Sequence, residues 1–257
     1  MKRLCMVTCM MVVSALLASG PGPAGKHLFI LSGQSNMARL DPAKSFTPTV
    51  ESVFGADRVI VIKDAMGGQP IRRWYRDWAP ADGDPPEGNG DLYDRLMSKV
   101  KRAIAGEEII SVTLVWMQGE RDAREAHGDV YGASLRGLIE QFRDDLGRED
   151  MGVVIGRIND FDLENRRYPH WSLVRSAQVA VAESGLRAAW VNTDDLNTGI
   201  NGKGEEVADD LHLTVKGYEE LGRRFAKEAI GIIRAQGKEQ NFRGSRRKRT
   251  NLENALN

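Results

Sequence analysis

The stretch 28–37, LFILSGQSNM, places a small nucleophile, Ser35, just after an apolar run that breaks at Gly33. A short, continuous apolar run predicts a strand buried on both faces, and Gly33 allows a tight turn after it. Asn36 and Met37 are expected to open a short helix, at whose N-terminus free N–H groups favour negative charge. The stretch therefore suits a serine acyl-transfer enzyme, whose tetrahedral intermediate carries an oxyanion. A serine that only caps the helix is the alternative.

A candidate general base lies near the other end of the chain, where Asp209 precedes His212 by three residues in a predicted loop. A carboxylate at this spacing can accept a hydrogen bond from one ring nitrogen while the other nitrogen takes the serine proton. Metal binding is the rival use of these residue types. The chain has no HExxH or CxxC spacing, so we predict no metal site.

Two more polar clusters follow predicted strands. Gly67 and Gly68 would let a backbone N–H approach a ligand closely, which suits an oxyanion donor, although a plain turn has the same composition. Gln118 could supply an amide donor and Glu120 a buried carboxylate. Ordinary surface polarity after a strand is the alternative for this second pair.

These clusters must be positioned by alternating strands and helices. Strands are predicted at 27–32, 59–63, 109–116, 153–158 and 186–191. Helical periodicity is found at 92–104, 131–146, 172–183 and from about 215 to 233. The alternation predicts a parallel sheet covered on both faces, with a site at the carboxyl ends of its strands.

Composition indicates one globular domain, because the chain has 257 residues of which 41% are hydrophobic. Residues 1–25 have the pattern of a secretory signal peptide, with Lys2 and Arg3 before a short apolar run. The run is too short to span a membrane, and no cysteine follows it for a lipid anchor. Cys5 and Cys9 both lie inside it, so the mature chain has no disulfide. We predict a secreted or periplasmic protein with no stable membrane insertion after signal removal.

Charge is unevenly distributed in a chain whose formal net charge is zero. The tail 236–257 has six cationic residues and two glutamates, a net charge of +4, and Lys2 and Arg3 add +2. The domain at 26–235 therefore carries −6, which disfavours a nucleic-acid partner. The tail is basic and poor in apolar residues, which predicts disorder.

Four motifs together resemble a known family. SGQSNM after the first strand is followed by GGxxI with a tryptophan, by WxQGExD and by DxxH. In this order they resemble the sialate O-acetylesterase and acetylxylan esterase group of the SGNH hydrolases, similar to carbohydrate esterase family 6. The resemblance implies a three-layer αβα sandwich with a five-stranded parallel sheet. It also implies a serine esterase that removes acetyl groups from carbohydrates without a cofactor.

The resemblance also implies roles for individual residues. Ser35 would be the nucleophile and His212 the general base. The triad acid would be Asp209 or, as in some members, Glu120; we expect Asp209 to orient His212 and Glu120 to steady the loop carrying Gln118. The backbone N–H groups of Ser35 and Gly68 and the side chain of Gln118 would form the oxyanion hole. Substrate contacts are expected from Gln34, Asn36, Gln69 and Trp74.

The chain departs from the family pattern at Met117, Arg121 and Gln69, which are expected to line the pocket. Two other functions remain open from the sequence: a catalytically silent sugar-binding protein of the same fold, and a lipase or thioesterase. The aromatic, polar segment around Trp74 favours a sugar over an acyl chain, because sugar faces stack on aromatic rings.

Overall fold

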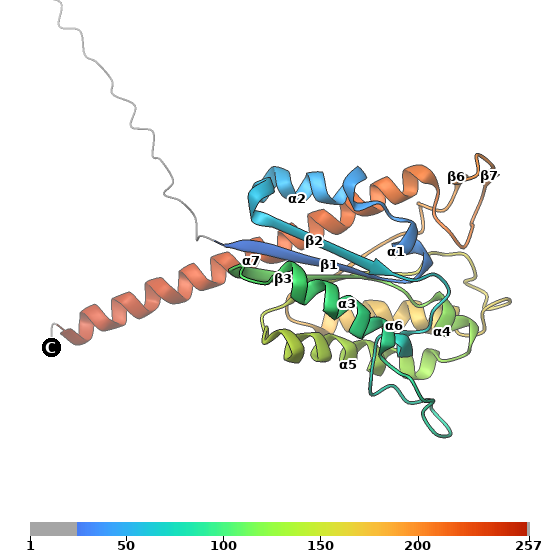
Figure 1. Cartoon of the computed structure of the whole chain (residues 1–257), viewed down its shortest axis with the longest axis horizontal. Helices are drawn as coiled ribbons and strands as arrows, with labels where there is room; N and C mark the ends of the chain where they lie inside the picture. Colours follow the sequence, from blue (N-terminus) through green and yellow to red (C-terminus); the bar gives the residue numbers. More distant parts are fainter. Residues whose placement is uncertain (1–24, 256–257) are drawn as a thin grey trace, which may run out of the picture.

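A computed structural model describes residues 25–255, with side chains described as far as residue 238. Its centre is a five-stranded, fully parallel sheet in the order β2-β1-β3-β4-β5 (Figure 1). The strands are β1 (Lys26–Gly33), β2 (Val59–Ala65), β3 (Ile109–Met117), β4 (Gly152–Gly156) and β5 (Ala188–Val191). All five predicted strands are present, and the predicted α/β fold is confirmed.

Helices cover both faces of the sheet (Figure 1). One face packs against α3 (Asp91–Ala103), α5 (Gly128–Leu146) and α6 (Trp171–Ser184), and the other against α2 (Phe46–Phe54) and α7 (Val215–Ala255). The short helices are α1 (Ser35–Arg39), α4 (Glu120–Arg124), and the 3-10 turns η1 (Pro42–Lys44), η2 (Ala56–Arg58) and η3 (Ile71–Arg73). A small hairpin, β6 (Gly199–Ile200) with β7 (Glu206–Val207), precedes α7.

The apolar run of β1 supplies both core layers. Leu28 and Ile30 join the core beneath α3, α5 and α6, whereas Phe29 and Leu31 join the core beneath α2 and α7. All four side chains are fully buried. Because successive side chains of a strand point to opposite faces, a continuous apolar sequence is what a central strand of a parallel sheet requires.

The order in which strands are added to the sheet reverses at β1. After β1 it crosses to β2 at the sheet edge, and then returns to place β3 on the other side of β1. Ligand sites in such sheets gather at the carboxyl ends of the strands that flank this reversal. Ser35, Gly68 and Glu120 follow β1, β2 and β3, so the topology brings together three segments that are distant in sequence.

Gly33 is required by close packing between these strand ends. Its φ is +141°, and a Cβ built on it would lie 1.9 Å from the carbonyl oxygen of Met117 in β3. Gln34 N–H donates to that same carbonyl oxygen at 2.9 Å. The glycine therefore allows the strand preceding the nucleophile to leave the sheet directly against β3.

Several elements were not predicted from the sequence. These are α2, α4 and the β6–β7 hairpin, all of which are short, and α2 also contains a proline in its first turn. Helix α7 also continues to Ala255. It therefore includes most of the segment from residue 236, which composition predicts to be disordered. This segment contains no proline and many Arg, Lys, Glu and Gln residues, which favour helix. No helix in the described part of the chain has the length and apolarity needed to cross a membrane.

Candidate active site

Ser35 and His212 lie in contact at the carboxyl edge of the sheet. His212 Nε2 is 3.1 Å from Ser35 Oγ, although the two residues are 177 positions apart in the chain. Burial, and then the nearby Arg39 guanidinium, lower the pKa of His212 below its usual 6.5, while Asp210 opposes the shift. The imidazole is therefore neutral at neutral pH and can accept the serine proton.

The carboxylate nearest the imidazole is Asp210. Its Oδ1 lies 4.0 Å from His212 Nδ1 and accepts a hydrogen bond from the His212 backbone N–H at 2.8 Å. Asp209, the expected orienting acid, is exposed, has a φ of +48°, and makes no ion pair with His212 in the described chain. Asp210, the next residue along the chain, is therefore the one that presents its carboxylate to the histidine.

Glu120 does not touch His212 but supports it through Asn36. Asn36 Nδ2 donates to Glu120 Oε1 at 2.8 Å and to the Leu211 carbonyl at 3.2 Å. Asn36 Oδ1 accepts from the Leu213 N–H at 3.3 Å and from the Tyr218 hydroxyl at 2.8 Å. Asn36 was expected to contact substrate. It is instead buried and joins the segment of Ser35 to both neighbours of His212.

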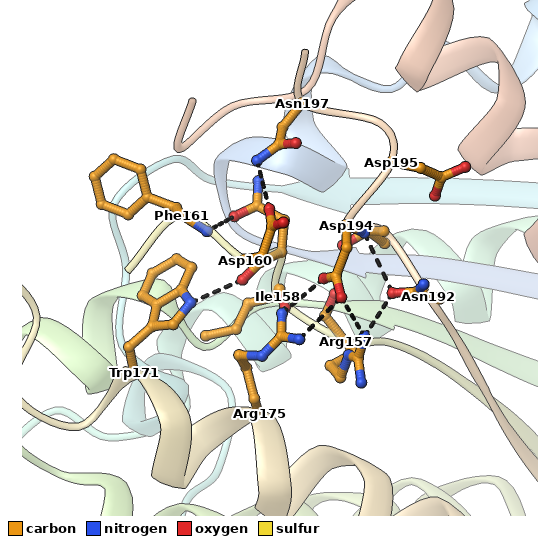
Figure 2. Close-up of polar contacts among 12 residues, drawn as sticks. Arg157, Ile158, Asp160, Phe161, Trp171, Arg175, Asn192, Asp194, Asp195 and Asn197 are labelled. Atoms are coloured by element: carbon orange, nitrogen blue, oxygen red, sulfur yellow. Dashed lines mark hydrogen bonds and ion pairs between the residues drawn. The ribbon is translucent and has the colours of Figure 1, made fainter. Parts of the chain in front are cut away.

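Further amides hold the loop that carries His212. Asn159 Nδ2 and Asn197 Nδ2 both donate to the Asp210 carbonyl, at 2.9 and 3.1 Å, and both side chains are buried. Figure 2 shows Asn197 directed at Asp160, whose Oδ1 accepts at 3.0 Å. The loops after β4 and β5 thus fix the backbone beside the histidine.

Arg157 and Arg175 both bind Asp194, and they join the loop after β5 to α6, which carries Arg175. Asp194 accepts hydrogen bonds from Arg175 at 2.8 and 3.1 Å and from Arg157 at 2.6 Å (Figure 2). Arg157 also donates to Asn192 Oδ1 at 2.6 Å. Paired carboxylate–guanidinium contacts are geometrically specific, so this cluster fixes the course of the loop after β5.

The loop after β2 brings two glycines beside Ser35. A Cβ built on Gly67 would lie 3.6 Å from Ser35 Cβ, and Gly68 has a φ of +70°. Both glycines, Ser35 and His212 line one cavity of about 280 Å³. The N–H of Ser35, at the first position of α1, has no acceptor within the helix. This arrangement fits the expected oxyanion hole of Ser35 and Gly68 backbone groups.

Gln118 has a different position from the one expected. It is fully buried, and its Nε2 donates to Asp122 Oδ2 at 2.5 Å, to the Gln69 carbonyl at 3.1 Å and to Gln34 Oε1 at 3.3 Å. It does not line the cavity of Ser35. Its amide therefore holds the loop after β2 instead of reaching a developing oxyanion.

The structure also revises the expected substrate contacts. Trp74 is 1% exposed and packs edge-on against Trp116 with ring centroids 5.3 Å apart, so it belongs to the core. Gln69 donates to the Gly67 carbonyl and accepts from Arg73, which stabilises its own loop. Gln34 does line the cavity, and its Oε1 accepts from the Arg121 N–H at 3.1 Å.

Other residues also line the cavity of Ser35. Of the three departures from the family pattern, Arg121 lines the cavity, while Met117 lies in the core. Arg124 and Tyr168 also line it and were not predicted. Tyr168 follows a long loop without regular periodicity, so no sequence signal placed it there. No cluster of three His, Cys, Asp or Glu side chains suited to a metal ion occurs among the described residues.

A family model described as carbohydrate esterase, sialic acid-specific acetylesterase, matches residues 38–231. The chain belongs to this family. The expected resemblance and the assignment as an ester hydrolase are thereby confirmed. A search of curated proteins gives no match for this carbohydrate esterase.

Solved structures share the fold of this carbohydrate esterase. A protein from Arabidopsis thaliana has a TM-score of 0.61 and 20% identity, over 81% of this chain and 99% of that one. A carbohydrate acetylesterase from Xanthomonas citri has a TM-score of 0.54 and 14% identity, over 81% of this chain and 56% of that one. The chain thus spans just over half of the Xanthomonas protein, and at these identities the likeness concerns the fold.

Substituting Gln118 tests its position in the structure. Gln118→Ala should lower the free energy of unfolding by about 1–3 kcal/mol, because the buried Asp122 carboxylate loses a hydrogen-bond donor. The turnover number should fall less than the roughly 100- to 1000-fold expected for loss of an oxyanion donor. Urea denaturation and initial rates on p-nitrophenyl acetate measure the two effects. A 100-fold loss of turnover at unchanged stability would return Gln118 to the oxyanion hole.

The burial of Glu120 predicts a pH-dependent stability. Burial raises its pKa from 4.5 to about 7, so the native state holds a proton that the unfolded state releases between these pH values. Stability therefore falls as pH rises through this window and stays lower above it. Glu120→Gln mimics the protonated form and should be more stable than the wild type at pH 8, by on the order of 1–3 kcal/mol.

Urea denaturation of both proteins at pH 4 and pH 8 measures this difference. The gap should nearly vanish at pH 4, where Glu120 is protonated in both the folded and unfolded states. Asp122, whose pKa burial also raises to about 7, is retained in both proteins and so does not contribute to the difference between them. A variant that is less stable than the wild type at pH 8 would show that the ionised carboxylate stabilises the fold.

Proposed function

We propose that this carbohydrate esterase removes acetyl groups from hydroxyls of an O-acetylated carbohydrate, with O-acetylated sialic acid as the first candidate and acetylated xylan as the second. The family description supports sialic acid. The observation that carries the proposal is the 3.1 Å contact of Ser35 Oγ with a neutral His212 at a cavity edged by Gly67 and Gly68.

The geometry supports a two-step acyl transfer. Ser35 Oγ attacks the acetyl carbonyl carbon while its proton passes to His212 Nε2, and the carbonyl oxygen becomes an oxyanion facing the Ser35 and Gly68 N–H groups. When the tetrahedral intermediate collapses, His212 returns this proton to the departing sugar oxygen. Water, deprotonated by His212, then hydrolyses the acetyl-serine ester, and acetate leaves with Ser35 regenerated.

The size of the cavity favours a short acyl group over a fatty acyl chain. At about 280 Å³ it is small, and Gln34, Glu120, Arg121 and Arg124 are among its lining residues. Long acyl chains need an apolar groove. This favours an acetylesterase over a lipase or thioesterase.

A series of p-nitrophenyl esters tests the proposal. Acetate should be hydrolysed with the highest kcat/KM, and rates should fall steeply from butyrate to octanoate. Release of acetate from O-acetylated sialic acids and from acetylated xylan then identifies the carbohydrate. A preference for octanoate, or no hydrolysis of any ester by folded protein, would contradict the proposal.

We also propose that the enzyme acts outside the cytoplasm. Support comes from the signal-like pattern at 1–25, which lies outside the described residues apart from Gly25. Mass spectrometry of the native protein should show that roughly the first two dozen residues are missing. A native protein that retains Met1–Leu17 would contradict export.

A further inference from the structure

A second, larger cavity adjoins the catalytic histidine. It has a volume of about 650 Å³, and its walls come from the segment after Ser35, the β6–β7 hairpin and the start of α7. Among the described residues, His212 alone lines both this cavity and the one containing Ser35. The imidazole therefore stands between the two spaces.

The reaction assigns different parts of the substrate to the two cavities. The departing oxygen must take its proton from His212, so the leaving group lies on the side of the imidazole. The acetyl group is small, and its carbonyl oxygen must face the N–H groups of Ser35 and Gly68 in the smaller cavity. The larger cavity, which His212 also lines, therefore has the room that the carbohydrate requires.

We propose that this larger cavity is the subsite for the leaving carbohydrate and that Arg39 binds a carboxylate carried by that sugar. This inference rests on the proposed function, since it concerns the same reaction. Arg39 is the fourth residue after Ser35 on α1, and residues four apart lie on one face of a helix. Its guanidinium is close enough to His212 to depress the pKa of the imidazole, which places the charge near the reacting ester.

The charged side chains of the wall, four carboxylates and three cations, differ in their partners. Asp41, Glu205 and Asp210 each accept a hydrogen bond within their own loops, from the Ala43 N–H, the Asn201 amide and the His212 N–H, respectively. Arg39, in contrast, has an exposed side chain that interacts with the Tyr218 hydroxyl and takes part in none of the ion pairs found among the described residues.

Two further cations, Lys44 and Lys203, line the same space, and Glu219 is its remaining carboxylate. A guanidinium binds a carboxylate through two parallel hydrogen bonds, so Arg39 is suited to recognise an acidic sugar.

The test compares an acidic with a neutral acetylated sugar. For wild type, Arg39→Gln, Arg39→Lys and a control variant, kcat/KM is measured on mono-O-acetylated N-acetylneuraminic acid and on acetylated xylo-oligosaccharide. Arg39→Gln should lower the acidic-to-neutral ratio of kcat/KM by roughly 10- to 100-fold, mainly through KM, because a charged hydrogen bond is lost. The ratio for Arg39→Lys should lie between those of the wild type and Arg39→Gln, since lysine keeps the charge but not the paired geometry.

Arg102→Gln is the matched control, because Arg102 is an exposed arginine on α3 that hydrogen-bonds Ser98 and does not line the cavity. Its ratio should equal that of the wild type. An unchanged ratio in Arg39→Gln would overturn the inference, as would a larger change in Glu219→Gln. A wild-type protein with no acetylesterase activity would contradict the proposed function itself, whereas an active enzyme whose preference ignores Arg39 contradicts only the subsite.

Discussion

Ser35→Ala is expected to reduce esterase turnover by roughly 10⁶-fold, to the background rate, while the protein stays folded. The magnitude follows from the loss of a nucleophile that acts as a unit with its base. The fold should persist because the Ser35 hydroxyl contacts His212, and Gln34, not Ser35, occupies the N-cap position of α1. Burst and steady-state rates on p-nitrophenyl acetate, with circular dichroism, measure both effects.

Ser52→Ala provides the matched control for this substitution. Ser52 is an exposed serine on α2 whose hydroxyl donates to the Thr49 carbonyl at 2.7 Å, and it lines neither of the two cavities beside His212. Its variant should keep wild-type turnover. Measurable turnover by Ser35→Ala above that of an identically purified blank would remove Ser35 from the role of nucleophile.

Asp210→Asn is expected to lower turnover by roughly 10²- to 10⁴-fold, more than Asp209→Asn or Glu120→Gln. Asp210 is the carboxylate that faces Nδ1 of His212, and a triad acid holds the imidazole in the productive tautomer. The separation of 4.0 Å is longer than a hydrogen bond, and such contacts commonly shorten when substrate binds. The upper end of the range assumes that shortening.

The three variants should be compared over a range of pH. Asp210→Asn should also lower the pKa of His212, because Asp210 is the carboxylate that raises it, and the acidic limb of kcat/KM should move to lower pH. Glu120→Gln should affect turnover moderately, through Asn36. A larger loss in Asp209→Asn would restore the assignment expected from the DxxH spacing, and a larger loss in Glu120→Gln would transfer the role to that residue.

The sequence was sufficient for the sheet, because buried parallel strands are continuous apolar runs that need no knowledge of their neighbours. It was also sufficient for Ser35 and His212, since few residue types can serve these roles and both lie directly after or before regular elements. Helix α2 was missed although Phe46, Val50 and Phe54 recur at helical spacing, because Pro48, a residue that commonly interrupts helices, lies in its first turn.

The directions of the side chains at the site could not be predicted from the sequence. Asp209 and Asp210 are adjacent, and only the structure shows that Asp210 is the one near the imidazole. Trp74 has an aromatic ring of the kind on which sugars stack, yet the loop after β2 packs this ring against Trp116. Gln118 likewise has the chemistry of an oxyanion donor, and only tertiary contacts show that its amide is occupied by Asp122.

The 177-residue separation of Ser35 from His212 affects when activity can arise during folding. The histidine lies immediately before α7, and its loop is held by Asn36, Asn159 and Asn197, so the catalytic pair forms only after the last helix has docked. Contacts between such distant residues carry a high loop-closure cost and form late. In a refolding experiment, catalytic competence should therefore lag behind the recovery of secondary structure, and hydrolysis of a chromogenic ester would report the final step of assembly.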